Sequence, residues 1–144
     1  MNAKLQGWLR LPNRERWQLA LMLLALPMVS LLLATAGYGR TRRVFERCSP
    51  HAGTRTPTPV EVAAAERLAQ LAALAGAHGP APASCLRQSL LTYLLLRRQG
   101  FDPALQIGAR RQAGQFDAHA WVELAGRALG QADLQHHAFQ PRSA

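Results

Sequence analysis

Apolar positions recur with different periods along the chain, and each change of period marks an element. Residues 17–38 form one apolar run without a charged side chain. Two later segments, 60–77 and 85–99, repeat their apolar residues at near-helical spacing, with polar residues between them. The period then falls to two, which predicts three strands, over residues 103–111, 118–124 and 127–131. The order helix, helix, strand, strand, strand indicates a small α+β domain.

Capping and turn residues set the limits of these elements. Ser84 is a suitable N-cap for the second helix, and Gly100 is a suitable residue just past its C-terminus. The segment 112–115, QAGQ, predicts a turn between the first two strands. Ala125 and Gly126 permit a tight reversal before the last strand, so residues 118–131 are expected to form a hairpin.

Composition divides the chain into three parts. Residues 1–47 form a hydrophobic helical segment with basic flanks. Residues 48–59 are rich in Pro, Ser, Thr and Gly, which is typical of a linker. The compact α+β domain is therefore expected over residues 60–144. No internal repeat is visible in the sequence.

The apolar run at 17–38 has three interpretations that the sequence leaves open. It is long enough to span a bilayer, and arginines on both sides prevent the positive-inside rule from orienting it. It is also compatible with a signal peptide that is cleaved after the segment 34–36, Ala-Thr-Ala. In the third interpretation it is a helical hairpin or a kinked helix, broken near Pro27, that packs on the domain, on a partner or on a membrane surface.

The balance of charge restricts the class of partner. The chain has 144 residues, of which 17 are Lys or Arg and 8 are Asp or Glu, giving a formal net charge of +9. Such a balance favours an anionic partner or a solvated, arginine-rich surface. The arginines are scattered along the chain, with pairs at 42–43, 97–98 and 110–111, instead of clustering among aromatic residues. We therefore do not expect nucleic acid to be the partner.

Two cysteines, Cys48 and Cys85, are too few for a disulfide-rich scaffold. They are compatible with one bridge or with a reduced protein that has one functional thiol. A zinc site would have to use Cys48 and His51, or the pair His136 and His137, but no second pair of ligands has zinc-finger spacing. We therefore expect no bound metal.

Cys85 and His119 are the strongest candidates for chemistry. A cysteine at the start of a helix lies beside unpaired N–H groups and the positive end of the helix dipole, which stabilise a thiolate. His119 lies on an alternating strand between two alanines, so its side chain is expected to face Cys85. Asp133, 14 residues further along the chain, falls where a neighbouring strand would offer a carboxylate to orient the imidazole. Structural roles for each residue, as a buried thiol, a packed histidine and a turn residue, stay open.

The joint pattern of these segments resembles a known family. A Cys-Leu helix that ends in Arg-Arg-x-Gly (residues 85–100), a strand with Ile107-Gly108, and the segment His-Ala-Trp-Val-Glu (119–123) are similar to the C-terminal domain of lasso peptide B proteins. The leucine-rich segment 10–26, with its basic lead-in, is similar to the first helix of that family. The resemblance implies a transglutaminase-like (papain-like) cysteine peptidase that removes the leader from a lasso peptide precursor.

The resemblance also implies roles for individual residues. Cys85 would be the nucleophile, His119 the general base and acid, and Asp133 the orienting carboxylate. Glu123 is only a fallback for Asp133, because the strand period places it two steps, or four residues, beyond His119. Trp121 lies on the same strand face, where it would line the substrate cleft or pack in the core.

Partners and location follow from the same resemblance. The chain would be a stand-alone peptidase in the cytoplasm that works with a separate leader-recognition protein and an asparagine-synthetase-like cyclase, and residues 17–38 offer a site for membrane association. Family behaviour implies that maturation depends on ATP, but no Gly-rich phosphate loop is visible, so we expect no cofactor bound directly to this chain. The alternative is a non-catalytic transglutaminase-like module that only binds peptides.

Overall fold

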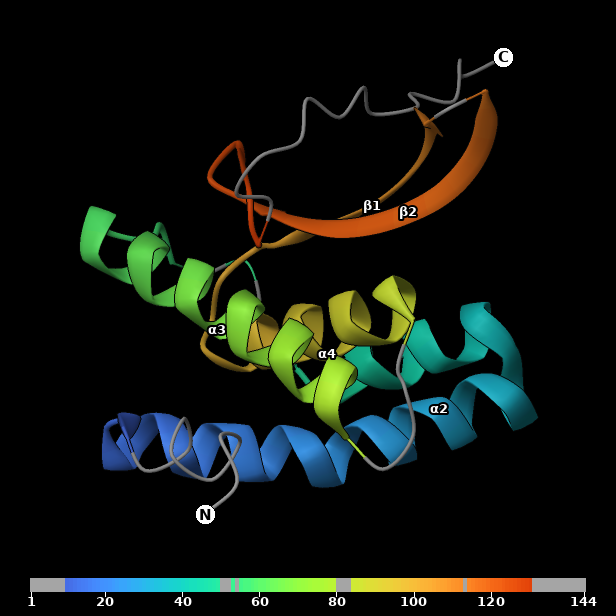
Figure 1. Cartoon of the computed structure of the whole chain (residues 1–144). Coiled ribbons are helices and arrows are strands. Elements are labelled where there is room, and N and C mark those ends of the chain that lie inside the picture. Colours follow the sequence, from blue (N-terminus) through green and yellow to red (C-terminus); the bar gives the residue numbers. More distant parts are fainter. Residues whose placement is uncertain (1–9, 50–52, 54, 80–83, 113, 131–144) are drawn as a thin grey trace.

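The computed structural model describes residues 10–49, 53, 55–79, 84–112 and 114–130. Figure 1 shows a layer of two helices between a long N-terminal helix and a small sheet. The predicted α+β class, the element order and the apolar N-terminal helix are confirmed. The elements are helices α2 (Asn13–Arg47), α3 (Pro59–His78) and α4 (Cys85–Arg98), and strands β1 (Ala104–Gln112), β2 (Gln115–Leu124) and β3 (Arg127–Ala128).

Helix α2 is kinked, but its break lies ten residues after the predicted one. Pro27 lies within continuous helix, whereas Gly37 has φ 73° and ψ 169°, outside the helical region. Glycine reaches a positive φ without steric cost, so the chain turns there. The hydroxyl of Thr41 donates to the carbonyl of Gly37 at 2.8 Å and helps to restart the helix. A break near Pro27 is therefore wrong, and glycine instead of proline interrupts the helix.

One face of α2 belongs to the core that the three helices share. Leu19, Met22, Leu26 and Val29 follow helical spacing and are buried in a cluster that includes Leu68 and other apolar residues of α3, α4 and β2. By length and composition α2 is also capable of crossing a membrane, with a mean hydropathy of 2.4 in its most apolar window, although core helices and signal sequences pass the same test. The burial of one face shows that α2 packs on the domain.

Helix α3 begins at a capping box and is tied to α2 by an ion pair. The Thr58 side chain accepts from the N–H of Glu61, and the Glu61 carboxylate accepts from the N–H of Thr58. Arg67 donates two hydrogen bonds of 2.9 Å to the carboxylate of Glu15 on α2. These bonds hold the pKa of Glu15 below its ordinary value. The pair therefore fixes α3 against the first turn of α2.

Helix α4 has the limits that the sequence predicts. Ser84 is its N-cap residue, and Gly100 follows its C-terminus with φ 90°. The N–H of Gly100 donates to the carbonyl of Arg97 at 3.0 Å, and the N–H of Phe101 donates to Leu96 at 3.3 Å. These bonds satisfy carbonyls that a helix end otherwise leaves unpaired. The chain then enters β1 with Phe101 fully buried.

The three strands form one antiparallel sheet in the order β1-β2-β3. Gly108 of β1 lies opposite His119 of β2. Ala125 and Gly126, with φ of 51° and 76°, form the tight reversal into β3, as predicted. Figure 1 shows the sheet on the side of the α3 and α4 layer that faces away from α2. This arrangement places the start of α4 next to β2.

The described part of the predicted linker contacts the domain. The N–H of Gly53 donates to the carbonyl of Phe101 at 3.1 Å. The guanidinium of Arg55 lies 4.6 Å from the centre of the Phe101 ring and donates to Glu61 at 2.6 Å. These contacts attach the segment between α2 and α3 to the turn that follows α4.

Candidate functional site

Cys85 is the first residue of α4. Ser84 holds the N-cap position in extended conformation, but its side chain makes no capping hydrogen bond within the described part of the chain. The first-turn N–H groups beside the sulfur are therefore not used by that hydroxyl, and such groups attract negative charge. Cys85 is a free, half-buried cysteine, and the other cysteine, Cys48, is free and exposed. No disulfide joins these two described residues.

The structure places the Cys85 thiol against the strand that carries His119. The Sγ atom lies 3.9 Å from the carbonyl oxygen of Ala118, the residue just before the histidine. One turn further along α4, the Ser89 hydroxyl donates to the carbonyl of Ala120 at 2.9 Å, and this bond is buried. The two contacts bracket His119 in the sequence of β2.

The spacing of α4 and β2 explains why both contacts form together. Four residues of helix rise about 6 Å, and two residues of strand rise about 6.7 Å. The carbonyl of Val122 accepts from Leu129 N–H at 2.8 Å, which shows that alternate carbonyls of β2 point away from β1. The carbonyls of Ala118 and Ala120 belong to the same series. Cys85 and Ser89 therefore meet successive acceptors on one edge of the strand.

His119 is held beside an aromatic neighbour. Its ring stacks on the indole of Trp121, with centroids 5.9 Å apart and an angle of 21° between the planes. Trp121 is 3% exposed, and its indole N–H donates to the carboxylate of Glu123 at 3.1 Å. The amide of Gln106 also donates to this carboxylate, at 3.4 Å. Glu123 therefore orients the indole of Trp121.

A cavity of about 210 Å³ opens over these residues. Its walls come from three elements that the chain brings together: α3, the polar face of α4, and β2 with the residues that follow β3. On α3 the lining residues are alanines, which leave room above the thiol and the imidazole. The lining residues are Ala69, Ala73, Cys85, Gln88, Ser89, Thr92, His119, Ala120, Trp121, Val122, Leu129 and Gly130.

Gln88 lies in the wall of this cavity because α3 has a glycine opposite it. Gly76 is buried, and a Cβ added there would overlap with the side-chain amide of Gln88. A glycine at this position lets the glutamine side chain lie close to α3. Only the packing of the two helices shows that the position of Gln88 depends on Gly76.

Glu66 fixes the end of the described chain at the rim of the cavity. Both of its carboxylate oxygens accept from the N–H of Gly130, at 3.0 and 3.1 Å. Gly130 has φ 71° and lines the cavity, so its backbone requires glycine. Sequence reasoning missed this contact, because nothing in the spacing relates Glu66 of α3 to a residue 64 positions later. Asp133 follows three residues after Gly130 in the sequence and lies outside the described residues.

Among the described residues, no three His, Cys, Asp or Glu side chains gather closely enough to hold a metal ion. The other residues considered as zinc ligands, His51, His136 and His137, lie outside the described part. What the site presents is a thiol at a helix start, an imidazole on the adjoining strand, and an open cavity over both. This combination is suited to nucleophilic attack by sulfur on a carbonyl group.

Comparison with known protein families shows which superfamily the sequence matches. The family model described as the transglutaminase-like superfamily matches residues 23–144, from Leu23 within α2 to the end of the chain. The matched range contains both Cys85 and His119. No curated protein and no solved structure matches the chain.

Proposed function

The chain belongs to the transglutaminase-like superfamily, which includes cysteine peptidases, and from this premise we propose that it removes the leader peptide from a ribosomally made lasso peptide precursor. The observation that carries the proposal is the position of Cys85 at the start of α4, 3.9 Å from the carbonyl that precedes His119. The cavity over both residues is the proposed binding site for the peptide residues beside the scissile bond.

In the proposed reaction Cys85 is the nucleophile. The Cys85 thiol gives its proton to His119. The resulting thiolate attacks the carbonyl carbon of the scissile bond, and the electron pair of the carbonyl moves to oxygen. The N–H groups at the start of α4 donate to this oxyanion. When the tetrahedral intermediate collapses, the bond to nitrogen breaks, His119 gives its proton to the leaving amine, and a thioester remains on Cys85.

His119 then acts a second time. The imidazole takes a proton from a water molecule, the hydroxide attacks the thioester, and the leader leaves with a new carboxylate while the thiol is restored. Asp133 is the proposed carboxylate that orients the imidazole and stabilises its protonated form. Trp121, stacked beside the imidazole, is the proposed wall against which the peptide packs.

The partners belong to the proposal as well. The resemblance to lasso peptide B proteins supports a separate leader-recognition protein that delivers the precursor, and an asparagine-synthetase-like cyclase that uses the released core. ATP is assigned to the coupled maturation reaction, with no cofactor held by this chain. The proposed location is the cytoplasm.

The test is cleavage of the precursor peptide encoded nearest to this protein, with the recognition protein and ATP supplied and the products measured by mass spectrometry. We expect wild type to release a fragment of leader size and Cys85→Ala to lose at least about a thousandfold of kcat/KM. Cys48→Ala is the matched control, because Cys48 is also a free cysteine but is exposed and does not line the cavity. Equal cleavage by the Cys85→Ala protein would refute the assignment of the nucleophile.

Alkylation separates an enzyme from a module that only binds peptides. In the folded protein an activated Cys85 reacts with iodoacetamide faster than the exposed Cys48 near neutral pH, although it is less accessible. Slower labelling of Cys85 together with absent cleavage would support the binding module instead. His119→Ala and Asp133→Asn are the next substitutions, and both are expected to lower kcat more than they raise KM.

A further inference from the structure

Helix α2 carries a line of large apolar side chains on the face that the domain does not cover. Trp17, Leu21, Leu24, Met28 and Leu31 are 57–79% exposed. Their spacing alternates between four and three residues, so all five lie along one side of the helix. The line is about 21 Å long. Its apolar area is on the order of 600 Å², at the upper end of what soluble monomers expose.

The opposite side of the same helix is buried in the core. Leu19, Met22, Leu26 and Val29 are 1–6% exposed and pack with the residues of α3 and α4. A helix that spans a bilayer would have lipid or other membrane helices around its whole circumference. In the folded domain only the outer side of α2 is available. This geometry favours a helix that lies along an apolar boundary over one that crosses it.

The charges around this line identify the kind of surface that fits it. Helix α2 contains six arginines and two glutamates. Both glutamates are in ion pairs, Glu15 with Arg67 and Glu46 with Arg42. Arg14 is exposed one turn before Trp17 on the same side of the helix, and within the described residues it pairs with no carboxylate. The outer side of α2 therefore combines apolar residues with uncompensated positive charge.

A second protein helix is a poorer fit than a lipid surface. Specific pairing of helices uses oppositely charged residues beside the apolar seam, and the positions that flank this one, Gln18, Ala20, Ala25 and Pro27, carry no charge. The apolar area also falls short of the roughly 800 Å² that each partner of a stable dimer buries. Anionic headgroups, in contrast, need only a basic and apolar face, and tryptophan is favoured at the level of the headgroups.

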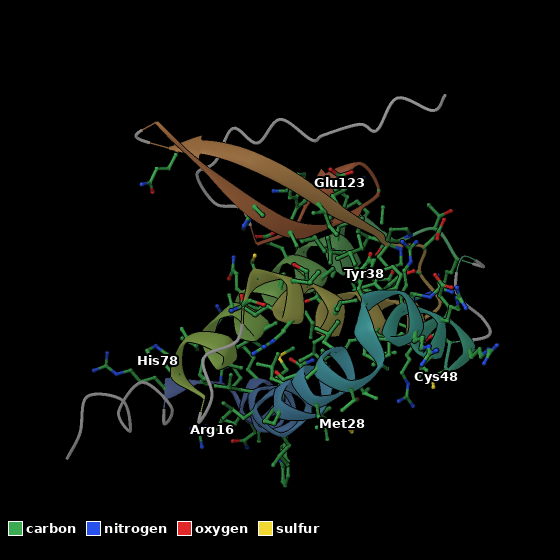
Figure 2. The ribbon with its side chains drawn as sticks, turned by 90° about the vertical axis from the view of Figure 1, so that its right-hand side faces the viewer. Arg16, Met28, Tyr38, Cys48, His78 and Glu123 are labelled. Carbon is green, nitrogen blue, oxygen red and sulfur yellow. The ribbon has the colours of Figure 1, made fainter. Side chains whose placement is uncertain are left out.

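We propose that the outer side of α2 docks the domain on an anionic lipid surface, with the helix axis in the plane of the membrane. Leu21, Leu24 and Met28 enter the boundary between headgroups and acyl chains, and Arg14 contacts lipid phosphates. Figure 1 shows that α3 and α4 separate α2 from the sheet, and Figure 2 shows Met28 and Glu123 on opposite sides of the molecule. The cavity between α3, α4 and β2 therefore stays open to the solvent in the docked protein.

Flotation with lipid vesicles tests the proposal on the full chain. We expect wild type to float with vesicles of phosphatidylcholine and phosphatidylglycerol, and to bind much more weakly to phosphatidylcholine alone. The triple variant Leu21→Gln/Leu24→Gln/Met28→Gln should bind anionic vesicles at least about tenfold more weakly. Arg14→Gln should weaken the binding to anionic vesicles about fivefold and leave the binding to neutral vesicles unchanged.

Two controls keep the result independent of folding and of catalysis. Val60→Gln removes an apolar side chain that is 78% exposed on α3, away from the line, and should bind like wild type. Cys85→Ala should also bind like wild type, since docking does not depend on the thiol. Thermal unfolding should show the triple variant folded, because its three side chains are exposed in the native structure.

Three outcomes would overturn the proposal. If wild type does not float with anionic vesicles, the outer side of α2 does not bind a lipid surface. The second outcome is that wild type forms dimers in sedimentation velocity, the triple variant is monomeric, and neither protein floats. The outer side of α2 then binds a second copy of the chain. Membrane-bound protein that resists washing with high salt and alkaline carbonate spans the bilayer.

Discussion

Replacing Ser89 by alanine tests whether α4 is held in register with the strand that carries His119. The Ser89 hydroxyl donates at 2.9 Å to the carbonyl of Ala120, and both residues are buried. One turn earlier on the same helix, the sulfur of Cys85 lies against the carbonyl of Ala118. The hydrogen bond of the Ser89 hydroxyl thus helps to hold α4 against this part of β2.

The expected loss of stability follows from the acceptor that is left behind. Without the hydroxyl, the carbonyl of Ala120 is buried with its donor removed, which costs about 1–2 kcal/mol. For a chain of 144 residues the midpoint of thermal unfolding should fall by about 3–7 °C. A shift of α4 along β2 also moves the Cys85 sulfur relative to the imidazole. We expect kcat to fall about tenfold or more, with KM changed much less.

The measurements are urea and thermal unfolding, followed by kinetics of precursor cleavage and the rate of Cys85 alkylation. Ser30→Ala is the matched control: its hydroxyl also makes a 2.9 Å bond, but to the carbonyl of Leu26 one turn earlier in α2. The Leu26 carbonyl belongs to continuous helix. Removing the Ser30 hydroxyl should therefore change the free energy of unfolding by less than about 0.5 kcal/mol. If Ser89→Ala and Ser30→Ala have equal effects, or if Ser89→Ala leaves kcat unchanged, the contact does not set the register.

Three further predictions concern the cavity walls and the ion pair. In Gly76→Ala the new methyl group displaces the Gln88 side chain, so precursor KM should rise by about threefold or more while circular dichroism stays native; an unchanged KM means that Gln88 does not shape the cleft. Glu123→Gln keeps an acceptor for the neighbouring indole, so kcat should stay within about threefold of wild type, and a loss as large as that of the catalytic variants would make this carboxylate the partner of the imidazole. Glu15→Gln removes the charge that Arg67 holds, at a cost of about 0.5 kcal/mol in this partly exposed pair. Because the pKa of Glu15 is lowered in the folded state, the difference in free energy of unfolding between this variant and wild type should be full above pH 4.5. It should vanish as pH falls through the lowered pKa. Urea unfolding at several pH values measures this difference, and a difference that grows in acid would contradict the reasoning.

Local signals in the sequence predicted most of the fold. Ser84 and Gly100 are capping residues, and the fall from helical to alternating spacing after α4 marks the strands, so the helix limits and the strand order could be read directly. The kink in α2 was misplaced, because proline is the stronger helix breaker in general. Pro27 is exposed within continuous helix, whereas Gly37 takes a positive φ that most other residues avoid.

The candidate site was only partly accessible from the sequence. Cys85 and His119 carry recognisable chemistry, and the structure brings the segments that hold them together. The roles of Gly76 and Glu66 arise from the contact of α3 with α4 and with the end of β3, which no local pattern records. Asp133 stays a prediction, since it lies outside the described residues.

The match between one turn of α4 and two residues of β2 limits how the site can evolve. Inserting one residue between Cys85 and Ser89 would turn one of them about 100° away from the strand, so both contacts could not form at once. Insertion in β2 between Ala118 and Ala120 would point one carbonyl to the opposite edge. Both intervals are therefore expected to keep a constant length in working relatives, whereas the turn between β1 and β2 is free to lengthen. An insertion in either element would therefore change the distance between thiol and imidazole by a whole residue step and not gradually. Sequence differences between working relatives should accumulate in the loops and in the lining of the cavity.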